Sequence, residues 1–247
     1  MITHIDTVVL TWNDGPLLET AVQSALVQDG VVPHVVVIDN ASDDQLAVSA
    51  ADNVTVVRNR ENRGVAAGRN QGVDLGNAPF ILLLDSDAEL SPGCAAALVA
   101  ALDADPDAGL AAPVFVGQPA EASAGREPSI ARKLARGLGL TASYGRTDHD
   151  DAAREWPVDF AIGACQLIRR DAWNAVGGLD ESFFYGPEDL DFCLRLRDHG
   201  FHVIQTAAAA CHHPARRRNR SLFARGGLRH ARALARHYAR RARRSIS

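Results

Sequence analysis

The stretch FILLLDSDAEL, residues 80 to 90, joins five consecutive apolar residues to two aspartates separated by one serine. The apolar run predicts a strand, and a strand that is apolar throughout is covered on both faces, as in a parallel sheet with helices on either side. Ligands in such sheets bind beyond the carboxyl ends of the strands. The stretch therefore predicts an α/β fold with a site at Asp85 and Asp87.

The same pattern recurs on the N-terminal side of this stretch. Further strands are predicted at residues 5–11, 35–38 and 54–57, and helices at residues 17–30 and 65–75. The second of these strands ends at Asp39. Because the carboxyl ends of parallel strands meet at one edge of a sheet, we expect Asp39, Asp85 and Asp87 to converge there.

The length and composition suit one α/β domain with an appendage. A chain of 247 residues with 47% hydrophobic content buries a full core. The four cysteines (Cys94, Cys165, Cys193 and Cys211) show no C-x-x-C spacing, which predicts reduced, buried side chains. No apolar run reaches the roughly 18 to 20 residues of a membrane span, and no signal peptide is recognised at the N-terminus. These features predict a cytoplasmic location.

The charge is distributed unevenly along the chain. Residues 214–247 contain twelve arginines and no acidic residue, so the net charge of −4 divides into +12 there and −16 over residues 1–213. An arginine-rich helix with an apolar stripe is predicted for this tail. Three interpretations stay open: the helix docks on the body, contacts the inner face of a membrane, or binds nucleic acid. Nucleic acid is disfavoured because no aromatic residues for base stacking are interleaved with the arginines.

The Asp85-Ser86-Asp87 sequence places two carboxylates close enough to share a hard divalent cation or a ribose hydroxyl. Oxygen ligands favour Mg²⁺ or Mn²⁺. Taken alone, a solvated turn or a helix cap explains the pair equally well. His212 and His213 follow an alanine-rich, strand-like run, so one imidazole is expected to face inward and complete a metal shell begun by Asp87.

A second group of acids surrounds the segment EDLD, residues 188–191, at the start of a predicted helix. The helix dipole favours acids at this position and explains one or two of them. It does not explain their gathering beside the aromatic, glycine-rich loop of residues 183–187. A carboxylate in a partly apolar pocket of this kind is suited to act as a general base for a hydroxyl.

Several other enzyme classes fit the sequence poorly. Residues 59–72 are glycine-rich but contain neither a phosphate-loop nor a dinucleotide fingerprint, which argues against P-loop ATPases and NAD-dependent dehydrogenases. A sugar-1-phosphate nucleotidyltransferase would usually carry lysine in the loop after its first strand, and residues 12–16 contain none. A non-catalytic nucleotide-binding homologue would be expected to have lost the acids that are present here. The last two classes stay as alternatives.

Six motifs follow one another in the order typical of family 2 glycosyltransferases. They are VVLTWN (8–13), VVVIDNASDD (35–44), ENRGVAAGRNQG (61–72), FILLLDSDAEL (80–90), GACQLIRRDAWNAVGGLDESFF (163–184) and EDLDFCLRLRDHG (188–200). The chain resembles this family over residues 5–213, in particular its bacterial rhamnosyltransferase-like branch. The resemblance implies a GT-A fold, in which a Rossmann-like, mostly parallel central sheet is flanked by helices. It also implies a nucleoside-diphosphate-sugar donor, Mn²⁺ or Mg²⁺ as cofactor, and inversion at the anomeric carbon.

The resemblance assigns donor-side roles by matching position. The implied nucleotide-sugar pocket comprises Thr11, Asn13, Asp39, Arg69, Asp85, Ser86 and Asp87. Within it, Asp39 is implied to read the base of the nucleotide. Asp87 is implied to bind the metal together with His212, with His213 as the alternative.

The acceptor-side roles come from the later motifs. Asp189 is implied to be the catalytic base, and Glu188 to orient the base or the acceptor. Trp156 and Asp159 are implied to border the acceptor cleft. We expect a UDP- or dTDP-sugar as donor, and a lipid-linked saccharide or a secondary metabolite as acceptor. The sequence leaves the oligomeric state open, with a homodimer as one option.

These roles divide the chain into a glycosyltransferase domain, residues 1–213, and the arginine-rich tail, residues 214–247. Within the domain, residues 1–116 form the expected nucleotide-binding half and residues 156–213 the acceptor and catalytic half. Residues 117–155 are poor in large apolar side chains and are expected to form a variable loop between the two halves.

Overall fold

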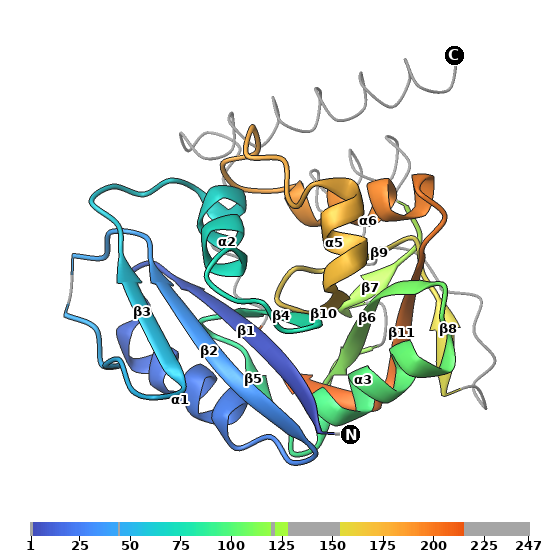
Figure 1. Cartoon of the computed structure of the whole chain (residues 1–247), viewed down its shortest axis with the longest axis horizontal. Coiled ribbons are helices and arrows are strands. Elements are labelled where there is room, and N and C mark those ends of the chain that lie inside the picture. The colour runs from blue at the N-terminus through green and yellow to red at the C-terminus, as the bar shows by residue number, and fades with distance from the viewer. Residues whose placement is uncertain (1, 44, 120–121, 128–153, 215–247) are drawn as a thin grey trace.

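The computed structural model describes residues 2–43, 45–119, 122–127 and 154–214. Strands and helices alternate in the first half of the chain, except that β3 follows β2 directly (Figure 1). Its elements are β1 Thr3–Thr11, α1 Gly15–Leu26, β2 Val31–Asp39, β3 Val54–Arg58, α2 Val65–Val73 and β4 Phe80–Asp85. They confirm the strands and helices predicted from the sequence, with small shifts at their ends.

These first four strands form a parallel unit in the order β3-β2-β1-β4. Strand β1 lies between β2 and β4, and its register pairs Thr11 with Asp39 and Leu10 with Asp85. Strands in parallel register end at the same edge of the sheet. The expected convergence of Asp39 and Asp85 at the carboxyl edge is therefore confirmed.

The second half of the chain extends the same sheet with mixed pairing. Its elements are β5 Glu89–Leu90, α3 Cys94–Ala104, β6 Ala108–Phe115, β7 Ala124–Gly125, β8 Glu155–Pro157, β9 Phe160–Ala161, β10 Cys165–Arg169, α5 Arg170–Val176, α6 Glu188–Asp198 and β11 His202–His212. Strand β10 runs antiparallel to both β4 and β6, whereas β11 runs parallel to β6. The sheet is thus mixed: the first four strands and the β6–β11 pair are parallel, and β10 between β4 and β6 is antiparallel. Strand β10 enters from the short turn after β9 rather than from a helical crossover, and a parallel neighbour would need such a crossover.

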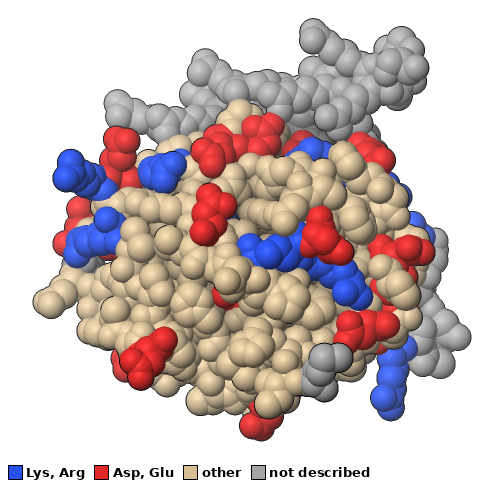
Figure 2. Space-filling model, viewed as in Figure 1, with Lys and Arg blue, Asp and Glu red and all other residues tan. Residues whose placement is uncertain are grey.

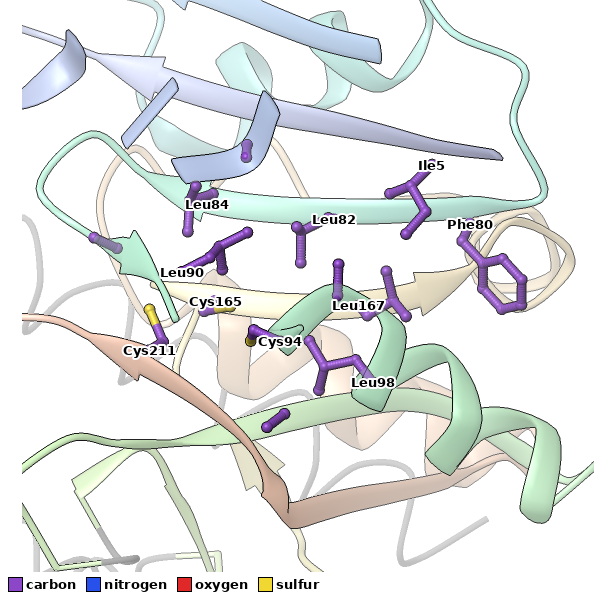
Figure 3. Close-up of a cluster of buried hydrophobic side chains, with 14 of the residues drawn as sticks. Ile5, Phe80, Leu82, Leu84, Leu90, Cys94, Leu98, Cys165, Leu167 and Cys211 are labelled. Carbon is purple, nitrogen blue, oxygen red and sulfur yellow. The ribbon is translucent and has the colours of Figure 1, made fainter. Parts of the chain in front are cut away.

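Both faces of the sheet are covered, which explains why its central strands are apolar throughout. Alternating side chains of these strands enter two separate cores. One core, drawn in Figure 3, contains Leu82 and Leu84 and packs against α1 and α3. The other contains Ile81 and Leu83 and packs against α2, α5 and α6. Burying one such leucine side chain contributes about 1.5–3 kcal/mol, so the alternation holds helices on both sides.

All four cysteines are buried, as expected from their spacing. On the face shown in Figure 2, acidic and basic side chains lie among uncharged ones. Within the described segments, no helix combines the length and the apolar character needed to cross a bilayer. The predicted tail helix and most of the predicted loop at 117–155 lie outside the described residues.

The amino edge of the sheet is held by a buried carboxylate, that of Asp6. Its Oδ1 lies 3.0 Å from His34 Nδ1. Its Oδ2 accepts hydrogen bonds from the Ala78 N–H at 2.7 Å and from Arg170 Nη2 at 2.7 Å. Four segments distant in sequence are therefore joined at one side chain, and the loss of a buried acceptor leaves its donors unpaired.

We expect Asp6→Asn to lower the free energy of unfolding by about 2 kcal/mol, because the amide cannot accept all three contacts. Urea unfolding measures this change. The matched control is Asp103→Asn, since Asp103 also faces an arginine but its side chain is 63% exposed. Its effect should stay within about 0.5 kcal/mol. Equal effects of the two substitutions would show that the buried Asp6 carboxylate does not stabilise the fold through its three contacts.

Candidate functional site

The carboxyl edge of the sheet holds two buried polar atoms without hydrogen-bond partners. Thr11 Oγ1 and Asp39 Oδ2 find no such partner among the described residues. Arg58 Nε lies 3.1 Å from this Asp39 oxygen, so the pair attracts by charge but lacks hydrogen-bond geometry. Asp39 Oδ1, in contrast, accepts the N–H of Ser42 at 2.9 Å. Buried polar groups are normally paired, so the unpaired atoms at these register-paired positions are a candidate place for a ligand.

The loops that follow β1, β2 and β4 are joined by side-chain hydrogen bonds. The Asn13 N–H donates to Ser42 Oγ at 2.9 Å, and Asn13 Oδ1 accepts the N–H of Asp43 at 2.8 Å. Asn13 has a φ of 58°, in the left-handed region that asparagine tolerates better than most residues. Ser86 Oγ donates to Asp14 Oδ2 at 3.0 Å. Asn13 and Ser86 therefore organise the rim around Thr11 and Asp39.

Asp85, Asp87 and His213 form a group whose ligand atoms all lie within 4.8 Å of one another. His213 Nε2 lies 3.4 Å from Asp87 Oδ1 and 4.0 Å from Asp85 Oδ2. The His213 ring also packs against Phe115 at a centroid distance of 5.0 Å. Two carboxylates and one imidazole are donors that suit Mn²⁺ or Mg²⁺, so these residues fit the metal that the sequence implied.

The histidine in this group is His213, the alternative residue, and not His212. His212 is the last residue of β11, pairs with Glu89 across the strands and has an exposed side chain. Successive side chains at a strand end point to opposite sides, so only one of two adjacent histidines reaches the carboxylates. The structure therefore transfers the candidate ligand role from His212 to His213.

The charge around His213 favours its protonated form. Burial lowers the pKa of His213, but the hydrogen bond to Asp87 and the charges of Asp85 and Asp87 outweigh it, so that the net shift is upward. A metal ligand must be neutral imidazole. Proton and metal therefore compete for this ring.

Arg69 is buried on α2 and does not contact Asp39 through any hydrogen bond or ion pair found in the described structure. Its Nη2 donates to Asp85 Oδ1 at 2.5 Å and to the Gly163 carbonyl at 2.7 Å. Its Nη1 lies 3.6 Å from Glu188 Oε1. The sequence placed Arg69 with the base-reading residues, whereas the structure places it between Asp85 and Glu188.

Glu188 and Asp189 lie in the first turn of α6, as the sequence predicted. Asp189 Oδ2 accepts the Gly163 N–H at 3.2 Å. Glu188 is buried, and its Oε2 has no hydrogen-bond partner among the described residues. Desolvation and the charge of Asp189 raise the pKa of Glu188 to about 7, against the opposing effect of Arg69. Near neutral pH Glu188 is therefore close to the midpoint of its titration.

The two acceptor-cleft candidates, Trp156 and Asp159, both contact other side chains of the protein. Trp156 is buried in β8, and its Nε1 donates to Gln205 Oε1 at 3.0 Å. Asp159 lies 2.9 Å from Arg197 Nη1 and 3.7 Å from Arg126 Nη1. Asp159 also borders a cavity of about 350 Å³ at the C-terminal end of α6, away from the first turn that carries Asp189. Their acceptor role stays a prediction.

Two contributors to the site were missed in the sequence. Gly163 begins the motif GACQLIRRDAWNAVGGLDESFF, which predicts no role for it, yet its peptide contacts both Arg69 and Asp189. Tyr185 is half exposed, and burial together with the charges of Asp85, Glu188 and Asp189 raises its pKa. The aromatic loop of residues 183–187 was the available signal for Tyr185.

The raised pKa of Glu188 predicts that the free energy of unfolding depends on pH. Its folded pKa of about 7 lies above the ordinary 4.5, so between these values the folded state holds a proton that the unfolded chain has lost. The free energy of unfolding attributable to Glu188 therefore falls as pH rises through this window. We expect Glu188→Gln to remove this fall. At pH 8 its free energy of unfolding should be higher than that of the wild type by on the order of 3 kcal/mol.

Urea unfolding at stepped pH, with the exposed Glu19→Gln as control, measures the difference between the two proteins. Parallel stability curves for wild type and Glu188→Gln would show that Glu188 has no raised pKa.

Comparison with known proteins identifies relatives of this chain. Residues 6–177 match the family model described as Glycosyl transferase family 2. Over 232 residues the chain is 29% identical to the N-acetylglucosaminyl-diphospho-decaprenol L-rhamnosyltransferase of Mycobacterium tuberculosis, covering 84% of this chain and 75% of that protein. It is 27% identical over 182 residues to a low-salt glycan biosynthesis hexosyltransferase of Haloferax volcanii, covering 70% of this chain and 56% of the relative.

Two solved structures have the same architecture. GalNAc-T7 with UDP, GalNAc and Mn²⁺ superposes with a TM-score of 0.67 at 16% identity, over 86% of this chain and 44% of that chain. The mannosyltransferase PcManGT from Pyrobaculum calidifontis, in complex with GDP-Man and Mn²⁺, gives a TM-score of 0.65 at 19% identity, over 98% of this chain and 65% of that one. The chain thus spans less than two thirds of either structure, and the likeness concerns the fold.

Proposed function

The chain belongs to glycosyl transferase family 2 and has the GT-A fold, and from this premise we propose a metal-assisted, inverting sugar transfer from a nucleoside-diphosphate sugar to an acceptor hydroxyl. The observation that carries the proposal is the carboxyl edge of the sheet. There the orphaned atoms of Thr11 and Asp39 lie on the same edge as the Asp85, Asp87 and His213 group. One ligand with a base and a diphosphate would use both.

The base end of the donor would bind at Asp39. A carboxylate oxygen accepts hydrogen bonds, so Asp39 Oδ2, which faces Arg58 but has no hydrogen bond, is available to an N–H donor of the ligand. The imide N–H of uracil or thymine supplies one such donor, and Thr11 Oγ1 is available for a neighbouring polar atom. The pairing accepts a UDP- or dTDP-sugar; guanine also carries ring and amino N–H donors, so the titration of the three diphosphates decides among the bases.

The diphosphate end would bind through a divalent ion held by Asp87 and His213, with Asp85 beside it. When bound, Mn²⁺ or Mg²⁺ supplies positive charge that neutralises the diphosphate as the sugar leaves. The protein's own contribution is to hold the two carboxylates at the end of β4 and the imidazole at the end of β11.

Asp189 is the proposed base. Its Oδ2 is fixed by the Gly163 N–H, and it stands at the start of α6 on the side of Arg69 and Glu188. Asp189 would take the proton of the acceptor hydroxyl while that oxygen attacks the anomeric carbon from the face opposite the leaving diphosphate. A single displacement of this kind inverts the centre. General-base catalysis contributes about 10²–10⁴ in rate.

A lipid-linked saccharide is the proposed acceptor class. The relative from Mycobacterium tuberculosis is described as transferring L-rhamnose to N-acetylglucosaminyl-diphospho-decaprenol. Peripheral membrane contact through the arginine-rich tail would fit such an acceptor, because clustered arginines attract anionic headgroups.

We expect calorimetric titration of UDP, dTDP and GDP to show selective binding of one diphosphate that Mn²⁺ strengthens. Asp87→Ala should abolish the strengthening by Mn²⁺, because it removes a charged ligand of the proposed site. Glu19→Ala, an exposed acid on α1, is the control and should bind as the wild type does. If the folded wild type binds none of the three diphosphates, the proposed function is contradicted.

For the base, we expect Asp189→Asn to lower the turnover number by about 10²–10⁴ while diphosphate affinity stays within threefold of wild type, because the base acts on the acceptor. The matched control is Asp191→Asn in the same helical turn, whose carboxylate pairs with Arg195 Nε at 2.8 Å. Release of nucleoside diphosphate from the donor measures both. Full activity of Asp189→Asn would remove Asp189 from this role.

A further inference from the structure

One buried guanidinium, that of Arg69, lies between the donor-side and acceptor-side acids. Arg69 is 3% exposed, and its neighbours come from three other elements. Nη2 contacts Asp85 at the end of β4, whereas Nη1 faces Glu188 at the start of α6. A buried cation requires such compensation, and an arginine can face two acids at once because its fork presents donors in a fixed plane.

The peptide of Gly163 completes the connection. Its carbonyl accepts Arg69 Nη2 at 2.7 Å, and its N–H donates to Asp189 Oδ2 at 3.2 Å. A continuous chain of contacts therefore runs from Asp85 through Arg69 and Gly163 to Asp189. This loop is itself anchored to β4, since the Asp85 N–H donates to the Ala164 carbonyl at 2.9 Å.

The residue at position 163 is constrained by this contact. A Cβ atom placed on Gly163 would lie 2.5 Å from Arg69 Nη1, closer than real Cβ contacts come. The backbone of Gly163 does not have a positive φ, so the conformation itself would accept alanine. The absence of a side chain is therefore needed for the close approach of Arg69, and not for the turn.

We propose that Arg69 and the Gly163 peptide form a positioning bridge that fixes Asp85 relative to the Glu188–Asp189 pair. The catalytic meaning of the bridge rests on the proposed glycosyl transfer, in which Asp85 belongs to the donor side and Asp189 to the acceptor side. The bridge holds the donor side by a direct hydrogen bond. It holds the acceptor side by charge at 3.6 Å and through the Gly163 N–H.

The geometry of the bridge is tested without substrate by thermal unfolding. We expect Gly163→Ala to lower the melting temperature in the wild-type background, because the new methyl group displaces Arg69. In an Arg69→Met background the same substitution should leave the melting temperature unchanged, because a flexible methionine gives way. An equal loss in both backgrounds would overturn the bridge.

The positioning role is tested by donor turnover, measured as release of nucleoside diphosphate from UDP-glucose, UDP-N-acetylglucosamine and dTDP-rhamnose with Mn²⁺. Arg69→Met and Gly163→Ala should each lower kcat about 100-fold, because misplacement of reacting groups by one ångström has that effect. The donor KM should stay within threefold. Arg69→Lys should recover part of kcat, since lysine can hold one acid but lacks the fork.

Arg170→Met is the matched control. It also removes an arginine from an ion pair with a buried aspartate, Asp6, but at the opposite edge of the sheet. It should lower the melting temperature and leave kcat unchanged. A loss of kcat in Arg170→Met equal to that in Arg69→Met, or a rise in KM without loss of kcat in Arg69→Met, would overturn the positioning role. A wild type without diphosphate binding or turnover would end the proposed function and this role with it, while the unfolding result would still decide the bridge.

Discussion

Parallel backbone pairing of β1 with β2 and β4 is the constraint on which the site depends. It places Thr11 beside Asp39 and Leu10 beside Asp85 at one edge. Because both faces of these strands are buried in apolar cores, the strand ends are where polar groups can gather at the lowest cost in free energy. The covered sheet thus delivers carboxylates to the edge.

The second half of the chain reaches that edge by a different route. Strand β10 runs antiparallel to β4, so its first residue, Cys165, lies beside Leu84 and brings the preceding loop to Asp85. Helix α6 begins nearby with Glu188 and Asp189. Glu188 faces Arg69, and Asp189 accepts the N–H of Gly163. A parallel first half and a mixed second half therefore build one site, and the buried Arg69 is one of the contacts that join them.

Some polar atoms of the site have hydrogen-bond partners and others have none. Thr11 Oγ1, Asp39 Oδ2 and Glu188 Oε2 lack hydrogen-bond partners within the described part of the chain, whereas Asp189 is held at both carboxylate oxygens. Unpaired buried atoms cost free energy until a ligand or a proton satisfies them. The fold carries this cost where the proposed donor base binds and where Glu188 takes up a proton near neutral pH.

Sequence alone determined the strand and helix pattern of the first half, the convergence of Asp39 and Asp85, and the place of Glu188 and Asp189 in the first turn of a helix. These features follow from local periodicity and from where apolar runs end. Only the tertiary structure decided that His213 rather than His212 joins Asp87, that Arg69 faces Asp85 and Glu188, and that β10 is antiparallel. The reason is physical: the side of a strand end that a residue occupies, and the partners that it meets across elements, depend on the packing of segments distant in the chain.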